Sequence, residues 1–177
     1  MIEHIEKIIT SWKTIFTVSD LKNLFETENE NTVRNYLSNG WKKWIFINFY
    51  YWIWWFKKYD LFELASKMKK NSYISFETVL KKEWIIFQDY WNNIFLASDN
   101  NIEKKTKDYN FKFLKIQDKI LYNPIWIIHK WNYAIASKER AICDRLYLSK
   151  NYYFDNLDWV DFEKLKQVAN IYNKRVI

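Results

Sequence analysis

The first 38 residues carry apolar side chains at helical spacing. Four isoleucines between residues 2 and 9 share one face of an amphipathic helix. In residues 16–25, Ser19 is a candidate N-cap ahead of three apolar residues that also share a helix face. Residues 31–38 repeat this pattern at i, i+3 and i+4. The chain is therefore predicted to begin with three short helices.

The third of these helices, over residues 31–38, has a short, polar and positively charged outer face. Asn29 and Asn31 are both candidate N-caps, and Gly40 is expected to end the helix. Its inner face is apolar and should contact a core. The opposite face is formed by four polar residues, which are Asn31, Arg34, Asn35 and Ser38.

A nearly continuous apolar run follows over residues 44–56. It is rich in aromatic and β-branched residues and has a candidate turn at Asn48 and Phe49, which predicts an antiparallel hairpin. The run is shorter than the roughly 20 residues that a membrane-spanning helix needs. Its ends are closed by two pairs of lysines, which are Lys42, Lys43, Lys57 and Lys58.

A polar helix followed by a hairpin with basic ends is typical of a winged helix-turn-helix. In such a domain the helix enters the major groove of DNA and the basic groups hold phosphates. No acidic residue occurs between Asn31 and Tyr59, which favours a polyanionic partner. The alternative is a purely structural hairpin whose basic rim is solvated.

From residue 72 onward, short apolar or alternating runs are separated by polar breaks, which predicts a mainly β region. Two helices are also expected, one after the candidate N-cap Ser137 and one near the C-terminus with Phe162 facing inward. Arg140 and Asp144 form an i, i+4 pair on the first of them. The predicted strands lie within residues 84–90, 93–99, 109–116, 125–130 and 132–137.

These patterns predict an α+β protein of two domains. Residues 1–68 are expected to form the winged helix-turn-helix domain together with a linking helix. Residues 69–177 are expected to form a mixed α/β C-terminal domain. It should begin with an extended segment that becomes helical, with Ser75 as a candidate cap.

Composition and charge indicate a folded, basic protein. Of its 177 residues 21% are aromatic, and the net charge is +7, which argues against a disordered chain. The single cysteine, Cys143, permits no internal disulfide and is expected in the core. The first residues lack the unbroken apolar run of a signal peptide. A soluble cytoplasmic protein is expected.

Glycine is scarce in this chain, and tryptophan is abundant. There are 11 Trp and 1 Gly, although average usage gives roughly a dozen glycines in a chain of this length. One hypothesis is that UGA codons that mean glycine in the source organism have been translated as tryptophan. The alternative is a tryptophan-rich protein with aromatic packing. The tryptophans that stand where the local pattern calls for glycine are Trp44, Trp52, Trp84 and Trp131.

Five segments stand in a particular order along the chain, namely FTVSDL, TVRNYLSNGWKKWIF, DLFELASK, SYISFETVL and NYAIASKERAICDRLYL. In order and spacing they resemble the AbiEi family, the antitoxins of type IV toxin-antitoxin systems. The resemblance covers nearly the whole chain, and SYISFETVL and ASKERAICD are its most specific parts. It implies an N-terminal winged helix that represses its own operon. It also implies a C-terminal domain that counters a nucleotidyltransferase-like toxin without forming a stable complex with it.

The resemblance places Thr32, Arg34 and Asn35 on a recognition helix. Arg34 is suited to guanine or to phosphate, and Asn35 to adenine. The four lysines at the ends of the hairpin would hold phosphates around the wing. Glu139, with the Arg140–Asp144 pair, matches the family's helix motif, where a structural salt bridge is the expected role.

A second basic segment lies in the C-terminal half and is predicted to be a loop. It would extend the DNA contact or serve antitoxicity, and a solvated loop without function is the alternative. Its basic residues are Lys104, Lys105 and Lys107.

The sequence carries no recognisable motif for catalysis, for a cofactor or for a metal. His4 and His129 are far apart, and with Cys143 they make neither a zinc site nor a Cys-His pair. We therefore expect a non-enzymatic antitoxin and transcriptional regulator, a repressor without cofactor that binds double-stranded operator DNA as a monomer or homodimer. No membrane partner is expected. The alternative is a protein- or RNA-interaction module in which the winged helix is only a scaffold.

Overall fold

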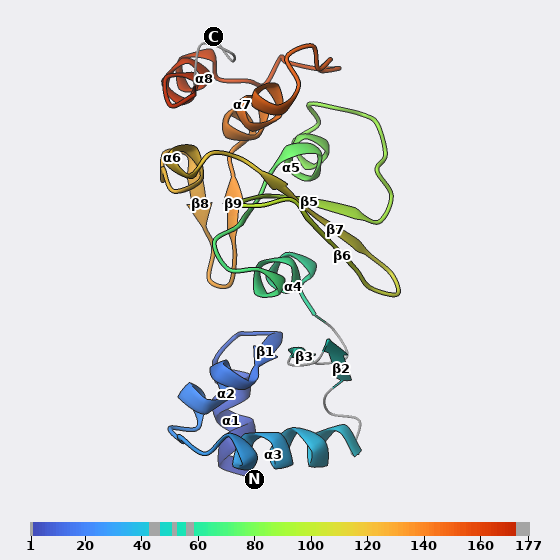
Figure 1. Cartoon of the computed structure of the whole chain (residues 1–177), viewed down its shortest axis with the longest axis vertical. Coiled ribbons are helices and arrows are strands. Elements are labelled where there is room, and N and C mark those ends of the chain that lie inside the picture. Colours follow the sequence, from blue (N-terminus) through green and yellow to red (C-terminus); the bar gives the residue numbers. More distant parts are fainter. Residues whose placement is uncertain (1, 43–46, 51–52, 56–58, 173–177) are drawn as a thin grey trace. The chain divides into compact units, whose positions relative to one another are not determined.

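The computed structural model describes residues 2–42, 47–50, 53–55 and 59–172 (Figure 1). It is an α+β structure, as the sequence predicts. The chain divides into two compact units, residues 1–68 (unit 1) and residues 69–177 (unit 2).

Unit 1 contains four helices and a small antiparallel sheet among its described residues. The strands occur in the order β1-β3-β2, so the first strand pairs with the last. The helices are α1 (Ile2–Thr10), α2 (Val18–Leu24), α3 (Glu30–Lys42) and α4 (Leu61–Met68). The strands are β1 (Ile15–Thr17), β2 (Ile47–Tyr50) and β3 (Ile53–Trp55).

The core of unit 1 is formed by apolar side chains of α1, β1, α2 and α3. The isoleucine stripe of α1 supplies Ile8, and the inner face of α3 supplies Val33 and Leu37. These side chains are at most 1% exposed. Burial of apolar side chains is the main force that holds short helices of this kind in place, because isolated helices of this length are marginal in water.

The N-cap of α2 is Thr17 and not the predicted Ser19. The Thr17 hydroxyl accepts a hydrogen bond from the Asp20 backbone N–H at 3.0 Å, and the Asp20 carboxylate accepts one from the Thr17 backbone N–H at 2.9 Å. This is a capping box, in which two otherwise unpaired donors are satisfied reciprocally. Ser19 therefore lies inside the helix.

Two boundaries of the α3–hairpin segment differ from the prediction. The helix α3 continues through Gly40 to Lys42, and Gly40 lacks the positive φ that a terminating glycine adopts. The hairpin of β2 and β3 is present, but Asn48 pairs with Trp54 inside the ladder. The predicted turn at Asn48 and Phe49 is therefore wrong, because both residues belong to strand β2.

Unit 2 is built on a six-stranded sheet in the order β6-β7-β5-β4-β9-β8. The pairs β5–β7 and β4–β9 are parallel and the others antiparallel, so the sheet is mixed. The strands are β4 (Tyr73–Ile74), β5 (Asn93–Ser98), β6 (Ile102–Lys105), β7 (Asn110–Lys115), β8 (Ile127–His129) and β9 (Ala134–Ala136). Parallel neighbours need crossover connections. The connection from β5 to β7 contains strand β6, and the connection from β4 to β9 contains helices α5 and α6 among other elements.

Among the described residues of unit 2, four helices accompany this sheet. The helix α5 packs against β5 and α7, and α7 packs against α8 (Figure 1). The predicted N-cap Ser137 is confirmed, since its side chain accepts a hydrogen bond from the Arg140 backbone N–H. The helices are α5 (Phe76–Lys82), α6 (Asp118–Leu121), α7 (Lys138–Leu148) and α8 (Phe162–Ala169).

Two predictions for unit 2 are wrong, and the one for Ser75 holds only for the position of the residue. Residues 84–90 form no strand, and the buried Ile85 and Ile86 lie in a loop where the Ile85 carbonyl accepts hydrogen bonds from two backbone N–H groups of residues 155–156. Ser75 stands at the N-cap position of α5, but its side chain makes no capping hydrogen bond. Phe162 is not inward-facing but 55% exposed. It is the first residue of α8 and lies on a different face of the helix from the buried Val168.

Candidate nucleic-acid interface

The helix α3 presents one apolar face and one polar face. Val33 and Leu37 are fully buried against α1, β1 and α2. All five candidate DNA-binding residues whose side chains the structure describes are exposed, and they share the opposite side of the helix. These residues are Asn31, Thr32, Arg34, Asn35 and Ser38.

The first turn of α3 is capped by Asn29, one of the two candidates. Its side-chain oxygen accepts hydrogen bonds from the backbone N–H groups of Asn31, at 2.9 Å, and Thr32, at 3.4 Å. The cap fixes where the helix begins. It leaves the side chains of Asn31 and Thr32 on the solvent side.

Arg34 forms an ion pair with Glu30, one turn earlier on α3. The guanidinium Nε lies 2.8 Å from the Glu30 carboxylate, and Nη2 contacts the same oxygen. Both side chains are about half exposed, so the pair is solvated and weak. Sequence reasoning missed this partner, although its i, i+4 spacing is a recognised signal.

A cluster of three rings joins α1, α2 and α3. The imidazole of His4 stacks on the ring of Phe25 with a centroid separation of 4.2 Å, and the Tyr36 ring meets both edge-on. Partial burial raises the pKa of Tyr36. Aromatic pairs of this geometry add to the energy of burial, so the cluster helps to hold the orientation of α3.

A buried carboxylate connects α4 to the rest of unit 1. One oxygen of Glu63 accepts hydrogen bonds from the backbone N–H of Thr14, at 2.9 Å, and from its hydroxyl, at 2.7 Å. Burial raises the pKa of Glu63, and these hydrogen bonds oppose that shift. The contact fixes the residue that precedes β1.

The basic residues at the ends of the hairpin are described only in part. Lys42 is the last residue of α3, and its side chain lies outside the described part of the structure. The predicted phosphate contacts Lys43, Lys57 and Lys58 also lie outside the described residues.

The second group of candidate lysines does not form the predicted loop. Lys104 and Lys105 belong to β6, which pairs with β7, and only Lys107 lies in the turn between these strands. This strand was not predicted from the sequence, because the three charged residues 103–105 have low β propensity. β6 stands at the edge of the sheet, where lysines protect an open strand from pairing with other chains.

The Arg140–Asp144 pair is present and fully buried. The Nε of Arg140 lies 3.6 Å from the Asp144 carboxylate, which also accepts hydrogen bonds from the hydroxyls of Ser75 at 2.6 Å, Tyr73 and Tyr172. The guanidinium in turn donates to the Tyr73 hydroxyl and to two backbone carbonyls. Each buried charge thus has several partners, which indicates a structural role.

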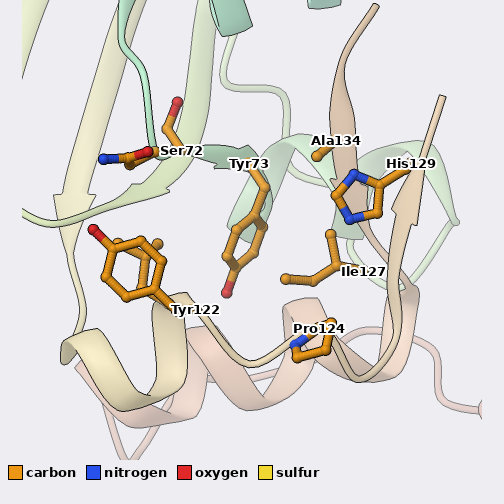
Figure 2. Close-up of a pocket in the computed structure, with 9 residues that line it drawn as sticks. Ser72, Tyr73, Tyr122, Pro124, Ile127, His129 and Ala134 are labelled. Atoms are coloured by element: carbon orange, nitrogen blue, oxygen red, sulfur yellow. The ribbon is translucent and has the colours of Figure 1, made fainter. Parts of the chain in front are cut away.

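A pocket of about 210 Å³ opens beside this network (Figure 2). The Tyr73 hydroxyl is already engaged by Asp144, and the lining set contains one histidine, His129, and no carboxylate or cysteine. The hydroxyl of Ser72, which also lines the pocket, donates to the Lys69 carbonyl at 2.8 Å. The lining residues are Asn71, Ser72, Tyr73, Leu121, Tyr122, Pro124, Ile127, His129 and Ala134.

Within residues 2–42, 47–50, 53–55 and 59–172 there is no group of three metal-ligating side chains. None of the helices described is both long and apolar enough to cross a membrane. No protein-family model matches the chain, and a search of curated proteins finds no match.

Proposed function

We propose that the chain is an AbiEi-type antitoxin and transcriptional repressor. Unit 1 acts as a winged helix-turn-helix that binds the double-stranded operator of its own operon. Unit 2 provides the antitoxic function against a nucleotidyltransferase-like toxin without a stable complex. In this proposal the protein is a binding protein and uses neither a catalytic site nor a cofactor.

The observation that carries the DNA-binding proposal is the two-faced character of α3. The helix is held to the core by Val33 and Leu37, while its polar side chains are left to solvent. A helix that enters the major groove needs this division between an anchored face and a polar reading face. Strand β1 precedes α2, and strands β2 and β3 follow α3. That these strands form one sheet in the order β1-β3-β2 also supports a winged arrangement.

The side chains on this face have suitable chemistry for reading bases. An arginine can donate two hydrogen bonds to guanine, and an asparagine can form a two-bonded pair with adenine. Arg34 and Asn35 are assigned these roles, with Asn31, Thr32 and Ser38 as neighbouring polar contacts. The lysines at the hairpin ends are assigned to phosphates, which position the protein and make its affinity depend on salt.

Fluorescence anisotropy tests this proposal with DNA from upstream of the gene and with scrambled DNA, over a series of salt concentrations. The parent should prefer the upstream DNA and bind more weakly as salt rises. Arg34→Ala should lose roughly tenfold or more of that preference. Lys166→Ala is the matched control, because Lys166 is also exposed and paired with an acid one turn away, Glu163, but lies in unit 2.

Equal and weak binding to both DNAs, unchanged by Arg34→Ala, would refute the repressor proposal. The second candidate, an interaction module that contacts protein or RNA, would then be preferred. It is supported by the positive charge that Lys104 and Lys105 bring to β6 in unit 2, which suits the phosphates of an RNA.

A further inference from the structure

Four tryptophans occupy backbone conformations that favour glycine. Trp12, Trp84, Trp91 and Trp126 have φ between 50° and 59°, and they are four of the seven described non-glycine residues with positive φ. Only a few per cent of non-glycine residues adopt positive φ, and for bulky side chains it is an outlier. The conformation of these four positions thus needs an explanation.

Trp84 ends helix α5 in the place of a terminating glycine. Its N–H donates to the Lys81 carbonyl at 3.1 Å, and the N–H of Ile85 donates to the Leu80 carbonyl at 2.8 Å. These two hydrogen bonds define the Schellman motif, in which the residue after the C-cap is left-handed and is usually glycine. Leu80 and Ile85 occupy the two positions at which the motif is usually accompanied by a hydrophobic contact, and both are fully buried.

Trp91 and Trp126 lie in two tight turns whose types require glycine. Asn93 N–H donates to the Tyr90 carbonyl at 3.0 Å, so Trp91 is the first central residue, which has positive φ in a type II′ turn. Ile127 N–H donates to the carbonyl of the only proline at 3.1 Å, so Trp126 is the second central residue, which has positive φ in a type II turn. Trp12 follows the last turn of α1 in the same left-handed conformation.

The indole rings at these positions gain little from burial. Trp12, Trp84 and Trp91 are 81%, 69% and 85% exposed, and Trp126 is half-buried. Burial is described for six tryptophan side chains, at positions 12, 84, 91, 126, 131 and 159, and none of them is buried. Packing in a core therefore does not explain tryptophan at these positions. Lys164 Nζ lies 5.0 Å from the centroid of the Trp126 ring.

We infer that the polypeptide made in its own cell carries glycine at positions 12, 84, 91 and 126. A gene in which UGA specifies glycine, translated with UGA read as tryptophan, gives this substitution at every UGA codon. The inference is independent of the proposed function. Of the four positions first suspected from the sequence, Trp84 has the expected conformation and Trp131 does not. Trp44 and Trp52 lie outside the described residues.

The decisive experiment is to read the four codons in the gene and to determine the masses of the corresponding peptides from the protein isolated from its source organism. We expect UGA at all four positions and peptide masses that correspond to glycine. UGG at these positions, or peptides that contain tryptophan, would overturn the inference.

Unfolding measurements test whether tryptophan at positions with positive φ destabilises the fold relative to glycine. Replacing Trp84, Trp91 and Trp126 by glycine should raise the ratio of folded to unfolded unit 2 by roughly tenfold or more, since each change relieves a left-handed bulky residue. The matched control is Trp159→Gly, because Trp159 is 72% exposed but does not have positive φ. A triple variant no more stable than the parent would contradict the inference.

Discussion

The ammonium group of Lys67 lies 2.8 Å from both carboxylate oxygens of Asp20, which joins α4 to α2. Lys13 lies 3.2 Å from the same carboxylate, and Thr17 uses it to complete the capping box. Burial opposes ionisation of Asp20, but hydrogen bonds from Lys67 and Thr17 prevail and lower its pKa from 3.8 to about 2. One side chain therefore serves both a helix cap and a contact between helices.

This geometry predicts a dependence of stability on acidic pH. A carboxyl whose pKa is lowered by folding stabilises the folded state above its unfolded pKa and loses that contribution as the pH falls through the folded value. The contribution of Asp20 should be present above pH 3.8 and disappear toward pH 2. Allowing for solvent screening, it should amount to about 1–2 kcal/mol in the free energy of unfolding.

Denaturant unfolding of the full chain between pH 2 and pH 7 measures this effect. Asp20→Asn should be less stable than the parent at pH 7 and approach it near pH 2. Asp108→Asn changes an exposed aspartate in the turn after β6 and provides the control. If Asp20→Asn differed from the parent by the same amount at both pH values, the linkage would be wrong.

If α3 binds DNA as proposed, the ion pair between Glu30 and Arg34 predicts a variant with a higher affinity for DNA. Glu30→Gln removes the negative charge that pairs with Arg34 and releases the guanidinium for the proposed contact with DNA. We expect roughly threefold to tenfold tighter binding at low salt, and a smaller gain as salt rises. The gain should shrink in an Arg34→Ala background, because part of it acts through Arg34.

Anisotropy titrations measure the DNA affinity of the parent, Glu30→Gln, Arg34→Ala and the double variant, which together form a double-mutant cycle. Glu163→Gln on α8 is the control, since it removes an exposed acid that pairs with a lysine, Lys166, one turn away. Weaker binding by Glu30→Gln would show that the carboxylate orders Arg34 for DNA instead of competing with it.

Much of the fold was predictable because most elements carry their own local signals. The helices α1, α3, α4 and α7 were predicted from apolar spacing and caps, and four of the five predicted strands of unit 2 are present. The strand β6 was not, because its charged residues 103–105 are stabilised by pairing with β7 and not by their own pattern. The opposite error occurred at Ile85 and Ile86, where a strand was predicted and a loop is found. A buried loop requires apolar residues just as a strand does, so the apolar pattern alone could not distinguish the two.

The candidate site was predictable only as a helix face. The i, i+3, i+4 spacing of Val33, Tyr36 and Leu37 was enough to assign the exposed side of α3. The Asp20–Lys67 contact could not be predicted, because the two residues are 47 positions apart and only the tertiary packing brings them together. The partners of Asp144 were hidden for the same reason, although its pairing with Arg140 was evident from their spacing.

The buried network around Asp144 predicts a large loss of stability on partial removal. Arg140→Met leaves a fully buried carboxylate without its counter-ion and should cost about 3–5 kcal/mol in the free energy of unfolding of unit 2. The double variant Arg140→Met, Asp144→Leu should recover part of that loss, because no uncompensated charge remains. Urea unfolding followed by aromatic fluorescence measures both.

Lys166→Met is the comparison for these variants, because it breaks the Lys166–Glu163 pair, which is exposed. It should leave the stability almost unchanged. A double variant less stable than Arg140→Met would show that the hydrogen bonds of Asp144 to Ser75, Tyr73 and Tyr172 outweigh the cost of burying its charge.

Cys143 offers an independent report on the same region, because it precedes Asp144 in α7 and is buried. Burial raises the pKa of its thiol from 9.0 to about 12, so the reactive thiolate should be roughly a thousandfold rarer at pH 8 than in the unfolded chain. A thiol reagent should therefore modify the native protein far more slowly than the protein in denaturant. Arg140→Met should accelerate the reaction by populating the unfolded state of unit 2. Equal rates for the native and the denatured protein would mean that Cys143 is accessible and that the described packing of α7 is wrong.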